Sequence, residues 1–262
     1  MLNKLLPTLD AAAAALGTLE PFDGRGTLTR NSDVARWKRR TVGALKGMCW
    51  HQELGWGSVE SVADYHTGPE SHLRVGGMES ISYTFAIRRN GQIVLCNDLD
   101  RRVWSQGYRD RAGDENSEFL SVMFEGYFRA PHVTEPSAGE PNDEQILAGL
   151  ALWRTSRDLW GWGSSDLYGH YHFGKAACPG YTLQSIIESV RANGAPPTVD
   201  LGTTRGRQEA LKALGFYEGA IDGDWGPVSK GALIRFQDGH GLSPDGVWGT
   251  TTDAAMRRAL AG

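Results

Sequence analysis

Alternating and periodic apolar positions predict the secondary structure of the first 190 residues. Apolar and polar side chains alternate over residues 82–88, and a second short strand pattern covers 92–96 after three residues with the composition of a tight turn, so we expect a β-hairpin. Short apolar runs predict further strands over 47–51 and 118–128, whereas apolar residues at helical spacing predict a helix over 143–160. The pattern indicates an α/β architecture in which helices form layers on a sheet.

A change of composition near residue 200 indicates a second domain. Residues 192–204 are rich in Gly, Pro and small polar side chains and follow a helical pattern over 183–190, so we expect a linker there. The pentapeptide Asp-Gly-x-Trp-Gly then occurs twice, starting at Asp222 and Asp245, an offset of 245 − 222 = 23 residues. Each copy precedes a helix-like stretch, which predicts a small all-α domain of three helices over 205–262.

The beginning of the chain is expected to pack on the larger, α/β domain. We assign residues 1–44 to a helical or extended segment and 45–191 to the α/β domain. Lys4 precedes an alanine run at Ala11–Ala15, but Pro7 interrupts the apolar stretch, which favours an ordinary helix over a cleaved signal peptide. The sequence has no run of about 20 apolar residues, so we expect no membrane span.

Charge and cysteine content exclude several classes of protein. With 27 Lys+Arg against 31 Asp+Glu the formal net charge is -4, which argues against nucleic acid as a partner. The three cysteines, Cys49, Cys96 and Cys178, are too few for a disulfide framework and do not have the spacing of a paired-thiol metal site. Nine Trp and 34 Gly favour turn-rich structure with stacking surfaces of the kind that meet sugars.

Residues 169–180 carry the most distinctive chemistry in the chain. This short segment, Gly-His-Tyr-His-Phe-Gly-Lys-Ala-Ala-Cys-Pro-Gly, contains two imidazoles, an amine and a thiol. Zinc takes neutral imidazole and thiolate ligands, and a catalytic zinc site has three protein ligands with the fourth position open to water. The third ligand must then come from elsewhere, and His51, at the end of a predicted strand, is our candidate.

The segment resembles the G-H-x-x-x-G-K-x-x-C-P-G loop of zinc amidases related to phage lysozyme-type amidases and peptidoglycan recognition proteins. The spacing from His170 to Cys178, 178 − 170 = 8, matches, and the resemblance covers roughly residues 45–190. It implies a mixed-sheet fold and hydrolysis of the amide bond between N-acetylmuramic acid and L-alanine in peptidoglycan. It also implies that His51, His170 and Cys178 hold Zn²⁺, that Tyr83 lies over the scissile carbonyl, and that Lys175 stands near the developing oxyanion.

The chain departs from the family pattern at several positions. Thr84 stands where a histidine often follows the tyrosine, and Trp104-Ser105 where another histidine often occurs. Some relatives use a glutamate as general base on the strand that here holds Met123 at the usual place. Glu125, two residues on and therefore on the same face, is our candidate base. His172 is an alternative ligand to His170, which the Gly-His start of the loop favours.

Two further pairs of residues are candidate contacts to substrate. His66 and His72 lie in the expected substrate-side loop, where the alternatives are a second metal site or loop packing. The C-terminal repeat resembles the peptidoglycan-binding domain appended to many wall hydrolases. Its Trp225 and Trp248 are candidates for binding the wall, with core packing as the alternative for each.

Three functions are consistent with these residues. The first is the zinc amidase. The second is a catalytically inactive peptidoglycan recognition protein, and the third is a peptidoglycan endopeptidase that uses zinc or the Cys178 thiol. We expect a monomeric phage endolysin that is made in the host cytoplasm without a cleaved signal peptide and reaches the cell wall after membrane permeabilisation. A mature protein starting near residues 17–20 would instead indicate a bacterial autolysin.

Overall fold

The chain folds into two compact units, Met1–Pro196 and Pro197–Gly262, which we describe one at a time. The computed structural model describes residues 1–16, 19–34, 38–106, 115–130, 138–193 and 201–261. Most of the expected linker, residues 194–200, lies outside this part of the chain. In the described part, no helix combines the length and the apolar character needed to cross a bilayer.

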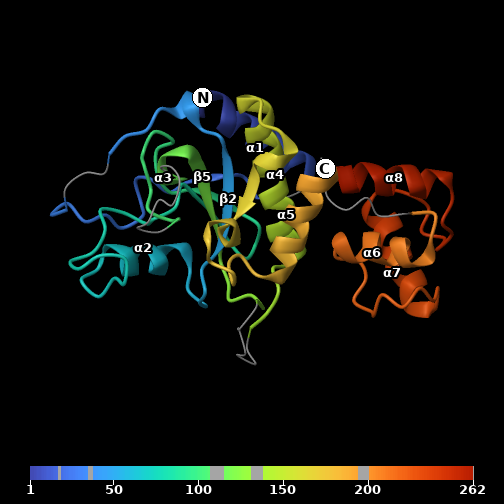
Figure 1. Ribbon diagram of the computed structural model, residues 1–262. Coiled ribbons are helices and arrows are strands. Elements are labelled where there is room, and N and C mark those ends of the chain that lie inside the picture. Colours follow the sequence, from blue (N-terminus) through green and yellow to red (C-terminus); the bar gives the residue numbers. More distant parts are fainter. Residues whose placement is uncertain (17–18, 35–37, 107–114, 131–137, 194–200, 262) are drawn as a thin grey trace. The chain divides into compact units, whose positions relative to one another are not determined.

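The first unit is built on a mixed sheet of six strands among the described residues, in the order β1-β4-β3-β5-β2-β6 (Figure 1). The strands are β1 (Phe22–Asp23), β2 (Gly47–Gln52), β3 (Phe85–Ile87), β4 (Ile93–Leu95), β5 (Phe119–Phe124) and β6 (Leu167–Gly169). β2 lies parallel to β5 and β6, and β3 lies parallel to β5. Only the β3–β4 pair is antiparallel among the described strands. The mixed sheet predicted from the sequence is confirmed.

Helices cover the two faces of this sheet, as the α/β pattern predicts. The helices α1 (Leu2–Leu16), α4 (Asp143–Trp160) and α5 (Tyr181–Asn193) lie together on one side (Figure 1). They pack on alternate strand residues such as Trp50 and Phe124 in the larger core. On the other face α2 (Val59–Thr67) packs against the intervening residues, among them Met123. Because strand side chains alternate, Cys49 and His51 belong to this α2 face.

Some predicted strands are longer than the observed ones. In the hairpin, the assigned strands are only β3 and β4. Before β3, the Asn97 side chain donates to the carbonyls of Ile81 and Tyr83, both at 2.8 Å, and so takes the place of a strand partner. β5 begins after the short helix α3 (Glu115–Glu118) and ends at Phe124. Beyond it Gly126, with φ 143°, turns the chain out of the sheet.

The predicted helix over 143–160 coincides with α4. It begins at a capping box, in which the Asn142 side chain accepts from the Gln145 N–H, and ends at Gly161 in the left-handed conformation. In the described part of the first unit there are also three short 3-10 turns: η1 (Val42–Ala44), η2 (Ser164–Asp166) and η3 (His170–Phe173). η3 follows directly on β6 and carries the first part of the chemically distinctive loop.

The second unit contains the helices α6 (Thr204–Ala213), α7 (Pro227–Gly239) and α8 (Thr250–Ala261), as predicted. Gly223 and Gly246, at equivalent positions of the repeat, have φ 81° and 67°, so each Asp-Gly pair makes the turn expected from its sequence.

A buried glutamine organises each copy of the repeat. Gln208 donates to Asp222 Oδ1 and Ser229 Oγ and accepts from the Gly223 N–H. In the second copy, Gln237 makes the equivalent bonds with Asp245 Oδ1, Thr252 Oγ1 and the Gly246 N–H. The repeat in sequence is therefore a repeat of one hydrogen-bonded turn closed onto a helix.

Candidate active site

His51 lies near the carboxyl end of β2, in the interior of the sheet. Its strand neighbours are β5 and β6 on either side, and Met123 is its partner in the register with β5. The side chain projects from the α2 face and is 1% exposed. Burial lowers the pKa of His51 well below its ordinary value, and the neighbouring His170 lowers it further, so the imidazole is neutral at physiological pH.

The loop after β6 brings His170 and Cys178 to His51. η3 places His170 directly after the strand, and the Tyr171 N–H donates to the Cys178 carbonyl at 3.0 Å, which closes the loop. The Nδ1 atoms of His51 and His170 are 3.1 Å apart, and Cys178 Sγ is 4.0 Å from His51 Nδ1. The candidate ligand atoms of the three residues all lie within 4.8 Å of one another.

This set of donors fits a zinc ion. Burial lowers the pKa of His170 to about 4 and raises that of the Cys178 thiol to about 12, although the Gln52 N–H and the charge of Lys175 oppose the second shift. Neutral imidazoles are ready to bind a metal, whereas a buried thiol ionises only when a cation compensates its charge. Two Nδ1 atoms that face each other can share one proton at most, whereas a metal engages both. Two nitrogens and one sulfur are the donors that zinc prefers.

Tyr83 and Lys175 both lie close to this cluster. The ring of Tyr83 is 5.3 Å from that of His51, measured between centroids. Burial raises the pKa of the Tyr83 hydroxyl, and the nearby Cys178 and Glu53 raise it further, so the phenol remains a hydrogen-bond donor. Lys175 is exposed, and its charge affects both His170 and Cys178.

Glu125 makes structural contacts with both carboxylate oxygens. One oxygen accepts from the Val59 N–H at 2.7 Å, at the N-terminus of α2, and the other accepts from the Arg89 N–H at 2.9 Å, in the β3–β4 turn. These bonds satisfy a helix terminus and a turn that would otherwise have unpaired donors. A role for Glu125 as base stays a prediction.

Gln52 and Glu53 are near the site and were not predicted from the sequence. The Gln52 N–H donates to Cys178 Sγ at 3.3 Å, and its side chain joins the Ala177 carbonyl, at 2.7 Å, to the Phe128 N–H, at 2.6 Å. Glu53 accepts from the N–H groups of Gly57 and Gly126. Gln52 and Glu53 are the two residues after His51. This position next to a predicted ligand is the signal in the sequence that could have identified them.

His66 lies beside Tyr83, and His72 lies beside His66, both outside the metal cluster. His66 Nδ1 accepts from the Ser82 N–H at 3.1 Å, and its ring is 5.8 Å from that of Tyr83. Burial, followed by the charge of His72, lowers the pKa of His66 to about 4. His72 is exposed and pairs with the Tyr65 hydroxyl at 3.0 Å. Within the described residues, the three-ligand group is formed by other side chains.

Trp225 and Trp248 are partly core and partly surface in the second unit. Both are half-buried and pack against its apolar cluster, with ring centroids 5.9 Å apart. Trp248 Nε1 donates to Asp253, and the Arg207 guanidinium lies 5.1 Å from the centroid of the Trp248 ring. Both tryptophans therefore pack in part against the core of this unit, and a role in binding the wall stays a prediction.

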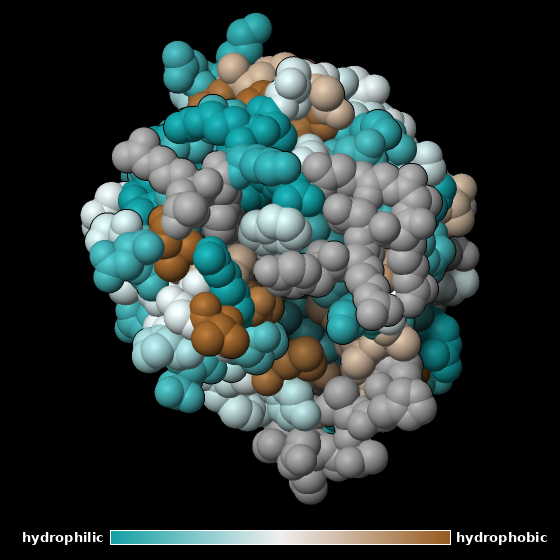
Figure 2. Space-filling view, turned by 60° about the vertical axis from the view of Figure 1, so that its left-hand side comes forward, coloured by the Kyte–Doolittle hydropathy of each residue, from teal (hydrophilic) through white to brown (hydrophobic). Residues whose placement is uncertain are grey.

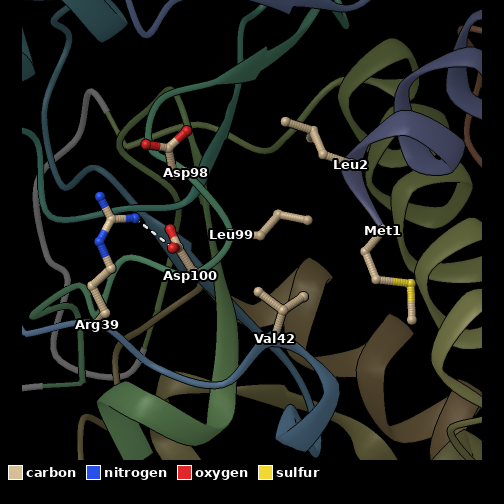
Figure 3. A pocket seen from close by; sticks show the side chains of 7 residues that line it. All are labelled: Met1, Leu2, Arg39, Val42, Asp98, Leu99 and Asp100. Atoms are coloured by element: carbon tan, nitrogen blue, oxygen red, sulfur yellow. Dashed lines mark hydrogen bonds and ion pairs between the residues drawn. The ribbon is translucent and has the colours of Figure 1, made fainter.

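A separate cavity of about 450 Å³ contains none of the predicted site residues (Figure 3). Its lining residues are Met1, Leu2, Arg39, Val42, Asp98, Leu99 and Asp100. Its charged side chains are paired, Asp98 with Arg25 and Asp100 with Arg39. Val42 precedes β2, whereas His51 lies at the opposite end of that strand, so the cavity is distinct from the histidine–cysteine cluster.

Comparison with known proteins gives matches for both units. Residues 44–181 match a family model described as N-acetylmuramoyl-L-alanine amidase, and residues 207–256 match one described as putative peptidoglycan binding domain. A curated relative, the N-acetylmuramoyl-L-alanine amidase CwlL of Bacillus licheniformis, is 42% identical over 86 residues. The match covers 30% of this chain and 23% of that relative, so the chain spans about a quarter of the relative's length.

Two solved structures illustrate the structural likeness. The endolysin amidase LysCS from Clostridium intestinale is 16% identical, with 63% of this chain and 89% of that chain covered and a TM-score of 0.41. The peptidoglycan recognition protein SD of Drosophila is also 16% identical, with 63% and 94% covered and a TM-score of 0.47.

Proposed function

Because this chain belongs to the N-acetylmuramoyl-L-alanine amidase family, whose model matches residues 44–181, we propose that it hydrolyses the amide bond between N-acetylmuramic acid and L-alanine in peptidoglycan. One observation carries the proposal. His51 on β2 and His170 and Cys178 after β6 come together with their ligand atoms within 4.8 Å, and the Tyr83 ring lies beside them. A pure recognition protein would not need this set of donors.

We propose that His51, His170 and Cys178 hold a zinc ion. Zinc bound there would supply Lewis-acid polarisation of the scissile carbonyl and a water whose pKa is lowered to about 7. The protein's own residues complete the chemistry. The Tyr83 hydroxyl stays protonated because its pKa is raised, so it can donate a hydrogen bond to the carbonyl oxygen as negative charge develops. The charge of Lys175 stabilises the same oxygen.

The general base is the remaining role, and Glu125 stays our candidate. Glu125→Gln should lower the melting temperature in either case, because the amide nitrogen cannot accept from one of the two backbone N–H groups. As a base, Glu125 predicts in addition that the folded Gln variant loses turnover with unchanged zinc content. A fall in melting temperature with turnover retained would assign Glu125 to the fold alone.

The second unit is proposed to bind the wall. Residues 207–256 match the peptidoglycan-binding family, and Trp225 and Trp248 present half-exposed aromatic surface on that unit. We propose that His66, beside Tyr83, and His72, beside His66, contact the substrate in the first unit.

We propose that the protein acts as a monomeric endolysin and keeps α1 in its mature form. Leu5 and Leu9 of α1 are 0% and 1% exposed and belong to the main core, so cleavage after this helix would remove part of that core. Mass spectrometry of the protein from producing cells tests this directly. A mature chain starting near residues 17–20 would support the autolysin alternative, and sedimentation tests the monomer.

Digestion of purified peptidoglycan tests the activity. Wild-type protein with about one zinc per chain should release stem peptides with a free N-terminal L-alanine and leave peptide-free glycan. Cys178→Ser should release neither. Cuts inside the stem peptide would instead establish an endopeptidase, and binding to the wall without any release would establish a recognition protein.

A further inference from the structure

The loop between β2 and α2 holds a large aromatic side chain in the open. Trp56 is 54% exposed, although tryptophan is usually well covered. The loop has a defined conformation, because the Glu53 carboxylate accepts from the Gly57 N–H at 2.8 Å and from the Gly126 N–H at 3.2 Å. Leu54 within it has φ 63°, a conformation that is strained for a leucine. Trp56 is thus held at the surface by a constrained backbone.

Two side chains from neighbouring loops fix the ring of Trp56. The Arg89 guanidinium, in the loop after β3, lies 4.8 Å from the ring centroid, and the Tyr127 ring, after β5, lies 6.4 Å away at 71°. The backbone of Arg89 is hydrogen-bonded through both its N–H and its carbonyl. Its N–H donates to Glu125, and its carbonyl accepts from the Asn142 side chain at 2.6 Å. The three residues form one preorganised cluster, which we call the Trp56 platform.

The Trp56 platform lies at the same edge of the sheet as the zinc-binding candidates. β2, β3 and β5 are parallel, so the loops that carry Trp56, Arg89 and Tyr127 all leave the sheet at its carboxyl edge. His51 is only five residues before Trp56, 56 − 51 = 5.

Glu53 links two of the loops that carry the platform. Its carboxylate accepts from the N–H of Gly57, which follows Trp56, and from the N–H of Gly126, which precedes Tyr127.

The chemistry of the platform fits a sugar ring. The C–H face of a pyranose packs against an aromatic face, whose π-system is electron-rich, and guanidinium N–H groups donate to hydroxyl and acetamido oxygens. A protein partner with a broad apolar interface fits this surface less well. Figure 2 views the α2 side of the first unit, and the hydrophobic residues among those coloured by hydropathy form small patches separated by hydrophilic ones.

We propose that Trp56, supported by Arg89 and Tyr127, is a saccharide subsite that stacks a pyranose ring of the glycan strand next to the scissile amide. This inference rests on the proposed function, because an amide between muramic acid and L-alanine has glycan on one side and peptide on the other. The platform then selects polymeric glycan over a single muramoyl peptide.

Kinetics on two soluble substrates test the subsite in the full-length, zinc-loaded protein. The substrates are an N-acetylmuramoyl peptide and a tetrasaccharide that carries the same peptide. Trp56→Ala should lower kcat/KM for the tetrasaccharide about tenfold and leave the monosaccharide substrate unchanged, and Arg89→Ala should act in the same direction. Trp56→Phe should retain most of the preference, because it keeps an aromatic face. Equal changes on both substrates, or none, would overturn the subsite.

A binding measurement separates this inference from the amidase proposal. Hydroxyl-radical footprinting of the wild type, read by mass spectrometry, should show protection of Trp56 by a peptide-free glycan tetrasaccharide. Trp160 is the reference, because it is half-buried on α4 and donates to the Val42 carbonyl, away from the platform. If neither substrate is cleaved at the amide, the amidase proposal fails, and protection of Trp56 still decides the subsite. Unchanged reactivity of Trp56 at saturating glycan would overturn it.

Discussion

The two units of this protein bury polar side chains in opposite ways. In the second unit, Gln208 and Gln237 are buried at 0% and 1% exposure and use both ends of the amide in hydrogen bonds to protein. In the first unit, His51, His170 and Cys178 are buried with their donor atoms directed at one another. Burying a polar group is costly unless a partner satisfies it. The glutamines therefore have a structural role, whereas the histidine–cysteine cluster has the donor set of a ligand-binding site.

The largest effect that tests this contrast is loss of the cluster. Cys178→Ser should reduce amide hydrolysis by about a thousandfold or more and lower zinc content, because a serine hydroxyl is a poor zinc ligand. Turnover and metal analysis on the same sample measure both. Cys96→Ala is the matched control, because Cys96 is also a free, fully buried cysteine but belongs to the core under α2. Zinc loss in the control would contradict the assignment.

The second largest effect is on the pH dependence of folding stability, and it comes from His66, a buried histidine outside the metal cluster. The pKa of His66 is lowered to about 4, so the unfolded chain binds more protons than the folded one below the ordinary value of 6.5. Stability should therefore fall as pH drops from 6.5 toward 4. His66→Gln, which keeps an acceptor for the Ser82 N–H, should reduce that fall by about 3 kcal/mol. Denaturant unfolding of both proteins across this range measures it, and parallel curves would refute it.

A smaller loss of stability is expected in the second unit. Gln208→Leu or Gln237→Leu keeps most of the volume but leaves the Gly223 or Gly246 N–H without its acceptor, which should cost about 2 kcal/mol of unfolding free energy. Hydrolysis of a small soluble muramoyl peptide should not change. Asp238→Ala, at an exposed neighbour of Gln237, is the control for thermal unfolding. If the leucine variants lost activity on the small substrate, the separation of roles between the units would be wrong.

The smallest effect expected is on zinc affinity through Gln52. Gln52→Leu removes the side-chain link between the Ala177 carbonyl and the Phe128 N–H, so zinc affinity should fall about tenfold as the cysteine loop loosens. Competition with a chelator measures the affinity. Gln184→Leu is the matched control, because Gln184 donates to the Ala176 carbonyl from the exposed side of the same loop. Equal effects of the two variants would show that Gln52 has no special position.

Much of the fold was predictable because local signals and tertiary structure agree in it. The capping box at Asn142 and the glycine after Trp160 mark both ends of α4 in the sequence, and the Asp-Gly turns mark the repeat. The hairpin was predicted too long because the Asn97 side chain, just beyond β4, takes the place of a strand partner for Ile81 and Tyr83. The alternation of apolar and polar residues does not distinguish a backbone partner from such a side-chain partner.

Residue types and motif spacing alone determined the family, the division into an α/β unit and a helical unit, and the candidates His51, His170 and Cys178. Tertiary structure alone decided what surrounds them. It directed both oxygens of Glu125 to backbone donors, placed Gln52 against the cysteine, and joined Trp56 to Arg89 and Tyr127. The physical reason is the parallel pairing of β2, β3 and β5, which brings loops more than thirty residues apart to one edge of the sheet, at separations no local pattern encodes.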